Sequence, residues 1–176
     1  MTLLDSMIDD LVRPIPDWPE PGVTFRDITP LLGDGAALAA TVDSLVELAA
    51  DAGPIDAVLG IEARGFIFGP AVALRLGVGF VPVRKIGKLP AETHSISYDL
   101  EYGSATLEMH VGALAPGARV LVIDDVLATG GTMLAAAELV RQAGGVVAGN
   151  VVLIEIAALG GVDRLAPVGC AALRTY

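Results

Sequence analysis

Continuous apolar runs alternate with alanine-rich segments along most of this chain. Four runs have the length and the branched residues of buried strands, at 58–61, 78–83, 120–123 and 151–156. Segments 70–76 and 132–142 lie between such runs and have the composition of helices. Because fully apolar strands alternate with helices, the pattern predicts an α/β fold with a mostly parallel sheet flanked by helices.

The N-terminal part has a different pattern. Apolar residues at three- and four-residue spacings predict an amphipathic helix over 3–12. Prolines crowd the stretch 14–27, which can therefore form neither a helix nor a central strand, and we expect an ordered arm. Asp34 is a candidate N-cap for a helix that ends near residue 51, before a Gly-Pro pair.

One polar stretch interrupts the alternation of strands and helices. Residues 84–104 are rich in Lys, Gly, Pro, Ser and Thr, and a long polar excursion in a compact domain is often a lid. The segment 105–111 then alternates between apolar and polar positions, which predicts a half-exposed strand. No linker is visible in the 176 residues, so we expect a single domain over 1–176.

The charge balance and the N-terminus narrow the choice of partners. The chain has 11 Lys and Arg against 21 Asp and Glu, a net charge of −10, which argues against a nucleic-acid or anionic-membrane partner. The N-terminus is acidic and no apolar stretch approaches the roughly 20 residues of a membrane span, so we expect a cytoplasmic protein. The single Cys170, among small apolar neighbours, is expected to be a buried filler.

The segment 120–132, VLVIDDVLATGGT, carries the strongest chemical signal. A Thr/Gly turn at a helix N-terminus presents backbone amides that can bind a phosphate, and Asp124 and Asp125 beside it can accept hydrogen bonds from sugar hydroxyls or face a divalent cation. A phosphorylated sugar fits both features. The alternatives are a tight connection beside a solvated strand end, and a phosphoacceptor aspartate, which would want a lysine on a later strand that this chain lacks.

A second signal is a local excess of basic residues. The window 61–90 has a net charge of +4, which leaves −14 for the rest of the chain, and Lys85 and Lys88 are the only lysines. We interpret this segment as a cationic flap for a polyanion, the alternative being a solvated charge cluster. Arg64 follows a buried strand and precedes a glycine, which suits a second phosphate. Together these features suggest a ligand with phosphate at each end.

These residues resemble the type I phosphoribosyltransferases, and within them the subgroup that acts on adenine. The run VLVIDDVLATGGT is similar to the family's phosphoribosyl pyrophosphate motif. The subgroup rests on PGVTFRDITPLL (21–32), EARGFIFGPAVALRLG (62–77), RKIGKLPAETHSISYDLEYG (84–103) and LAPV (165–168). The resemblance implies the type I phosphoribosyltransferase fold, a mostly parallel twisted sheet with a small N-terminal hood over 1–33 and a flexible lid over 84–104.

The resemblance also implies roles for individual residues. The 5-phosphate would be bound by Ala128, Thr129, Gly130, Gly131 and Thr132. Asp124 and Asp125 would hold the ribose hydroxyls and, with Glu101 as the group that moves a proton, would form the catalytic set. The pyrophosphate would be bound by Glu62, Ala63, Arg64, Gly65, Arg84, Lys85, Lys88 and Tyr102. Adenine would be bound by Thr24, Phe25, Arg26 and Val126.

The activity that the resemblance implies is transfer of a 5-phosphoribosyl group from phosphoribosyl pyrophosphate to adenine, which gives AMP and pyrophosphate. It further implies Mg²⁺ held mainly through substrate oxygens, no metal site built from protein ligands alone, and a homodimer. One departure is Glu62-Ala63, where a smaller polar pair often stands, and another is Val126, where a larger aliphatic residue often stands. The alternatives are transfer to another purine, xanthine or guanine, and a non-catalytic regulator that senses phosphoribosyl pyrophosphate.

Overall fold

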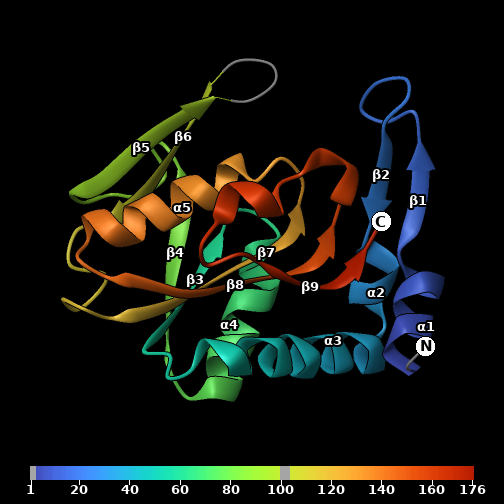
Figure 1. Cartoon of the computed structure of the whole chain (residues 1–176), viewed down its shortest axis with the longest axis horizontal. Helices are drawn as coiled ribbons and strands as arrows, with labels where there is room; N and C mark the ends of the chain where they lie inside the picture. Colours follow the sequence, from blue (N-terminus) through green and yellow to red (C-terminus); the bar gives the residue numbers. More distant parts are fainter. Residues whose placement is uncertain (1–2, 100–103) are drawn as a thin grey trace. The chain divides into compact units, whose positions relative to one another are not determined.

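The central element of the fold is a mostly parallel sheet (Figure 1). The computed structural model describes residues 3–99 and 104–176, and within them the sheet has seven strands in the order β5-β6-β4-β3-β7-β8-β9. The strands are β3 (Ala57–Ile61), β4 (Gly79–Lys85), β5 (Thr93–Asp99), β6 (Ser104–His110), β7 (Arg119–Leu127), β8 (Val146–Glu155) and β9 (Ala171–Thr175). Pairs β3–β4, β3–β7, β7–β8 and β8–β9 are parallel, whereas β6 pairs antiparallel with β4 and β5.

Two helices cover opposite faces of this sheet. Helix α4 (Gly65–Leu76) packs on β3, β4 and β7, and helix α5 (Gly131–Gln142) lies on the other face, against β5, β7 and β8 (Figure 1). The apolar core under α5 includes Leu59, Val81 and Val122 from neighbouring strands. These side chains alternate along each strand with those that face α4, so both faces of the central strands are buried. The predicted strands, helices and parallel sheet are therefore confirmed.

The chain divides into two compact units, Met1–Ser44 and Leu45–Tyr176. The first contains α1 (Leu3–Leu11), β1 (Arg13–Pro16), β2 (Thr24–Asp27), α2 (Thr29–Gly33) and most of α3 (Gly35–Leu48). The helix predicted over 3–12 is confirmed by α1. The proline-rich arm forms a two-stranded antiparallel ribbon in which Arg13 is opposite Asp27, so the prolines avoid a central strand as predicted. A single domain over 1–176 stays a prediction.

The predicted N-cap of α3 is confirmed by the structure. Asp34 Oδ1 accepts hydrogen bonds from the backbone N–H groups of Ala36 and Ala37, each 2.9 Å long. These bonds satisfy two donors that have no partner inside the first turn of a helix. At the other end α3 continues into a short 3-10 turn, η1 (Ala49–Ala52), close to the predicted end of the helix.

The predicted lid contains regular structure that the sequence analysis missed. Arg84 and Lys85 belong to the end of β4, and residues 93–99 form β5, which pairs with β6 over its whole length. Ile96 and Tyr98 are half-buried while Ser95 and Ser97 are exposed, so this segment has the two-residue period of a strand although its composition is polar. Strand β6 confirms the strand predicted over 105–111.

The C-terminal part completes the second unit. Two short 3-10 turns, η2 (Ala157–Leu159) and η3 (Val162–Leu165), follow β8 and lead to β9, which the sequence analysis did not predict. Strand β9 is five residues long and only partly buried, so it lacks the continuous apolar run that identifies the inner strands. Among the described residues, no helix combines the length and the apolar character needed to cross a membrane.

Candidate functional site

The predicted phosphate loop lies where β7 passes into α5. Gly130 has a φ of 81°, a left-handed conformation that favours glycine, and α5 begins at the next residue. Residues 128–132 line a small cavity of about 80 Å³ together with Asp124 and Val126. The hydroxyl oxygens of Thr132 and Tyr98 are 3.1 Å apart, within hydrogen-bond distance, which brings strand β5 to the loop. The structure therefore gathers all five predicted phosphate-loop residues and one of the two acids around one cavity.

The acidic pair at the end of β7 is largely buried. Asp125 is 4% exposed, and its Oδ2 lies 2.9 Å from Nε of Arg64. Asp124 Oδ1 accepts the backbone N–H of Asp125 at 2.9 Å. Burial raises the pKa of Asp124 well above its usual value, and the charge of Asp125 raises it further. Burial also raises the pKa of Asp125, although the guanidinium of Arg64 opposes this shift.

The loop after β3 lies against the acidic pair. Arg64 is the last residue before α4, which starts at Gly65. A Cβ atom at Gly65 would lie 2.9 Å from the Ile123 carbonyl oxygen, so this loop packs tightly on the end of β7. The Arg64 side chain is 38% exposed even though it pairs with Asp125, and it can therefore reach a ligand as well. The structure thus brings together two residues that were expected to bind different parts of one substrate, Asp125 the ribose hydroxyls and Arg64 the pyrophosphate.

Glu62 connects the same loop to the basic segment. Its Oε2 accepts the backbone N–H of Lys85 at 3.0 Å and lies 3.3 Å from Nε of Arg84. The Lys85 backbone bond, opposed by burial and aided by Arg84, lowers the pKa of Glu62 below its usual value. Glu62 is therefore an ionised carboxylate that pairs with Arg84. The peptide bond between Glu62 and Ala63 is cis. Lys85 and Lys88 have exposed side chains.

Glu108 on β6 is a structural residue that the sequence analysis missed. It is 5% exposed, and its Oε1 accepts the backbone N–H groups of Lys88 and Leu89, each at 2.8 Å. Burial by itself raises the pKa of Glu108, but the backbone N–H groups that face it hold the pKa below its usual value. The turn that carries Lys88 is thus fixed by a buried carboxylate. The sequence did contain a signal for this residue, because Glu108 is an acid between two apolar residues, Leu107 and Met109.

The predicted adenine-binding residues belong to two different units. Thr24, Phe25 and Arg26 form part of β2 in the first unit, and the Phe25 ring packs edge-on against the Trp18 ring, with centroids 4.5 Å apart. Val126 is half-buried on β7 in the second unit. How these residues meet a base stays a prediction. Glu101 and Tyr102 lie outside the described residues, so their roles also stay predictions.

Two further side-chain properties bear on the chemistry. Burial raises the pKa of the half-buried Cys170 thiol to about 12, and the charge of Glu155 adds to this shift. The thiol is therefore protonated at neutral pH and unsuited to be a nucleophile, as its small neighbours suggested. Within residues 3–99 and 104–176, no group of three or more His, Cys, Asp and Glu side chains is arranged to hold a metal ion.

Comparison with known proteins assigns the family. Residues 32–171 match the model of the phosphoribosyl transferase domain. The chain belongs to the phosphoribosyltransferase family. Within this family it is 58% identical, over 174 residues, to adenine phosphoribosyltransferase from Thermobifida fusca, an alignment that covers 99% of the chain and 98% of that relative.

Solved structures give the same grouping within the phosphoribosyltransferase family. The crystal structure of adenine phosphoribosyltransferase from Thermoanaerobacter pseudethanolicus superimposes with a TM-score of 0.93 at 45% identity, covering 98% of this chain and 99% of that one. The enzyme from Saccharomyces cerevisiae, complexed with an imino-altritol 1,6-bisphosphate and adenine, superimposes with a TM-score of 0.88 at 35% identity, covering 95% and 96%. The predicted type I phosphoribosyltransferase fold and the adenine subgroup are confirmed.

Proposed function

We propose that this protein transfers the 5-phosphoribosyl group from phosphoribosyl pyrophosphate to adenine, a purine-salvage reaction that gives AMP and pyrophosphate. The observation that carries the proposal is the loop 128–132, which opens α5 and lines one cavity with Asp124. Backbone amides at the start of a helix suit the dianionic 5-phosphate. The choice of adenine as the base rests on the similarity to adenine phosphoribosyltransferases, of which the yeast enzyme was crystallised with adenine.

Substrate binding changes the partners of Arg64 and Asp125. In the structure these two residues form an ion pair, with Nε of Arg64 2.9 Å from Oδ2 of Asp125. When phosphoribosyl pyrophosphate binds, the ribose hydroxyls donate to Asp124 and Asp125, and Arg64 turns its guanidinium to the pyrophosphate. Each charged group then keeps a partner, so the exchange avoids leaving an unpaired charge in a buried place. Glu62, Ala63 and Gly65 complete this pyrophosphate loop.

Arg84, Lys85 and Lys88 provide the remaining positive charge for the leaving pyrophosphate, with Tyr102 near the far end of the lid. Glu62 and Glu108 hold the backbone of this segment through hydrogen bonds to Lys85, Lys88 and Leu89. The carboxylates at the end of β7 suit Mg²⁺, which commonly uses one or two carboxylates together with substrate phosphates. Mg²⁺ bound with the substrate would neutralise charge on the leaving pyrophosphate.

The chemical step breaks the bond between the anomeric carbon and the pyrophosphate oxygen and forms a bond from that carbon to a ring nitrogen of adenine. The electron pair of the broken bond leaves with pyrophosphate, and the proton released from the imidazole ring goes to Glu101. Holding the two reactants in line contributes up to about 7–11 kcal/mol in favourable cases. Closure of the lid over 84–104 excludes water, which would otherwise hydrolyse the activated sugar.

The family resemblance implies that Phe25 and Val126 would contact the base and that the backbone groups of Thr24 and Arg26 would read its edge. The same phosphoribosyl site would serve a transferase for xanthine or guanine, so base selection depends on these residues and on Glu101. A non-catalytic regulator would be expected to lack the acidic pair or to carry a DNA-binding segment. We further propose a cytoplasmic homodimer without nucleic-acid or membrane partners, as the family resemblance and the acidic charge suggest.

The proposed function is tested by supplying each base separately. The protein is mixed with Mg²⁺, phosphoribosyl pyrophosphate and adenine, guanine, hypoxanthine or xanthine, and the nucleotides formed are identified by chromatography. Adenine is expected to be converted to AMP, with one pyrophosphate released for each AMP. If only an oxo-purine were converted, the protein would be a phosphoribosyltransferase for that purine and not for adenine. If the protein bound phosphoribosyl pyrophosphate but converted no base, the result would support the alternative of a non-catalytic regulator.

A further inference from the structure

The segment that follows β8 approaches the phosphate loop very closely. Gly161 is buried, and a Cβ atom at this position would overlap the carbonyl oxygen of Ala128 and lie 3.0 Å from the backbone nitrogen of Gly130. In the opposite direction, a Cβ atom at Gly130 would lie 2.7 Å from the Gly161 carbonyl oxygen. The two backbones therefore pack together without room for a side chain on either one.

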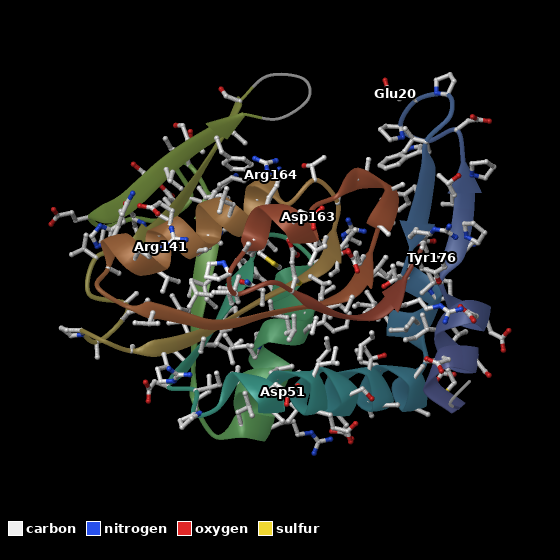
Figure 2. All side chains as sticks on the ribbon, viewed as in Figure 1. Glu20, Asp51, Arg141, Asp163, Arg164 and Tyr176 are labelled. Carbon is white, nitrogen blue, oxygen red and sulfur yellow. The ribbon has the colours of Figure 1, made fainter. Side chains whose placement is uncertain are left out.

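An arginine from the same segment holds the loop by a hydrogen bond. Arg164 lies on η3, which packs against α5, and its Nη1 donates to the carbonyl oxygen of Thr129 at 3.0 Å. Figure 2 shows Arg164 near the first turn of α5, whereas Arg141 lies toward the other end of that helix. The Thr129–Gly130 peptide is trans and planar, so its C=O and N–H groups point in opposite directions. Because the carbonyl of Thr129 is held toward Arg164, the N–H of Gly130 points away from it.

We propose that Arg164 is a positioning residue of the 5-phosphate site and that Gly161 forms the wall behind the loop. Arg164 fixes the one peptide group whose rotation would take the Gly130 N–H away from the phosphate, and its positive charge lies next to a site for a dianion. The ligand chemistry is a phosphate monoester, carried by phosphoribosyl pyrophosphate and by AMP. The inference rests on the proposed function, because it assumes that residues 128–132 bind this phosphate.

The test compares Arg164→Ala with Arg141→Ala as a matched control. Arg141 lies in the last turn of α5, where it pairs with Glu138, and it has no contact with the loop among the interactions that the structure gives for it. The dissociation constant of AMP is measured by titration calorimetry, and the KM values of phosphoribosyl pyrophosphate and adenine are measured by steady-state kinetics. For Arg164→Ala we expect AMP to bind about tenfold more weakly and the KM of phosphoribosyl pyrophosphate to rise similarly. The KM of adenine is expected to stay constant in both variants.

A second pair of variants tests the wall. Gly161→Ala is expected to displace the loop and to weaken AMP binding at least as much as Arg164→Ala, whereas Gly79→Ala, where a Cβ atom meets nothing within 4 Å, is expected to bind AMP normally. If Gly161→Ala fails to fold, Arg164→Ala decides the question alone. A nuclear-magnetic-resonance titration adds a signature that general destabilisation would not give, since the Gly130 amide proton should shift on AMP addition in the parent protein and much less in Arg164→Ala.

Thr132→Val separates failure of this inference from failure of the proposed function. If Thr132→Val weakens AMP binding while Arg164→Ala binds AMP like the parent protein, the phosphate loop is correct and the positioning role of Arg164 is wrong. If neither variant changes AMP binding, the phosphate lies elsewhere and the proposed site itself is wrong. An equal rise in the KM of adenine and of phosphoribosyl pyrophosphate in Arg164→Ala would also overturn the inference, because it would indicate a general loss of structure.

Discussion

Asp124 is expected to bind the ribose hydroxyls of the substrate, and the burial of its carboxyl lowers the stability of the fold. Its carboxyl is largely buried, and the burial and Asp125 together raise its pKa. A group whose pKa is raised on folding favours the folded state while it is protonated, and this contribution is lost as the pH rises through the folded pKa. The raised pKa of Asp124 therefore lowers the stability of the fold at neutral pH, where an aspartate in the unfolded chain is ionised. A destabilising carboxyl at this position is explained by binding of the ribose hydroxyls and not by packing.

Asp124→Asn is therefore expected to make the protein more stable at pH 7 and less active. Removing the buried charge should raise the free energy of unfolding by about 1 kcal/mol, the usual size of a single stabilising substitution. The gain should shrink as the pH is lowered through about 4, because the parent carboxyl then becomes protonated in the unfolded state as well as in the folded one. Urea unfolding at several pH values measures this change, and kcat/KM is expected to fall at least about tenfold. A variant less stable than the parent at pH 7 would contradict the interpretation.

At the scale of elements, Asp27 joins the end of β2 to the start of α2. It accepts hydrogen bonds from the side-chain and backbone groups of Thr29 and pairs with Arg13 on β1, with Nη2 and Oδ2 2.6 Å apart. The hydroxyl of Thr29, its backbone N–H and the charge of Arg13 together lower the pKa of Asp27 to about 2. The ribbon and the helix that follow the proline-rich arm are thus held by one carboxylate.

Asp27→Asn is expected to lower the melting temperature at neutral pH. A pKa lowered on folding stabilises the folded state above the unfolded pKa, and this stabilisation is lost as the pH falls toward the folded value. The difference in melting temperature between parent and variant should therefore narrow between about pH 4 and about pH 2. Asp10→Asn, at an exposed position on α1, is the control and should change the melting temperature little. A difference that stays constant across this pH range would show that the charge of Asp27 is irrelevant.

Glu108→Leu tests the other structural carboxylate, which fixes the turn between β4 and β5. Without an acceptor, the backbone N–H groups of Lys88 and Leu89 lose their hydrogen bonds to Glu108, and the turn should become more mobile. The expected result is a KM for phosphoribosyl pyrophosphate raised several-fold, with the KM of adenine unchanged. Glu108→Gln keeps an acceptor oxygen and should recover most of the affinity. Glu47→Gln, an exposed acid on α3, serves as the control.

For the whole molecule, the sequence predicted the parts whose signal is local. The inner strands are apolar along their whole length, and the phosphate loop combines a buried strand, two acids and a glycine turn within thirteen residues. Strand β5 was missed because its polar composition hid its alternation. The contacts of Arg64 with Asp125 and of Glu108 with Lys88 join residues far apart in the sequence. Such contacts depend on tertiary packing, which no pattern along the chain records.

The proposed pyrophosphate site can be labelled selectively because it contains all the lysines of the chain. The chain has only two lysines, Lys85 and Lys88, and both side chains are exposed. An amine-acylating reagent should therefore modify these two positions and the N-terminus, in amounts that mass spectrometry can measure. Phosphoribosyl pyrophosphate with Mg²⁺ should protect both lysines but not the N-terminus, because the pyrophosphate covers the ammonium groups.

AMP provides the control for this labelling, since it occupies the phosphate loop without a pyrophosphate and should leave both lysines reactive. Raising the salt concentration should weaken the protection, because exposed ammonium groups are screened within about 10 Å at 0.1 M ionic strength. Equal protection by AMP and by phosphoribosyl pyrophosphate would mean that lid closure, rather than contact with pyrophosphate, shields the lysines. Unprotected lysines at saturating phosphoribosyl pyrophosphate would remove Lys85 and Lys88 from the site and leave Arg64 and Arg84 as its cations.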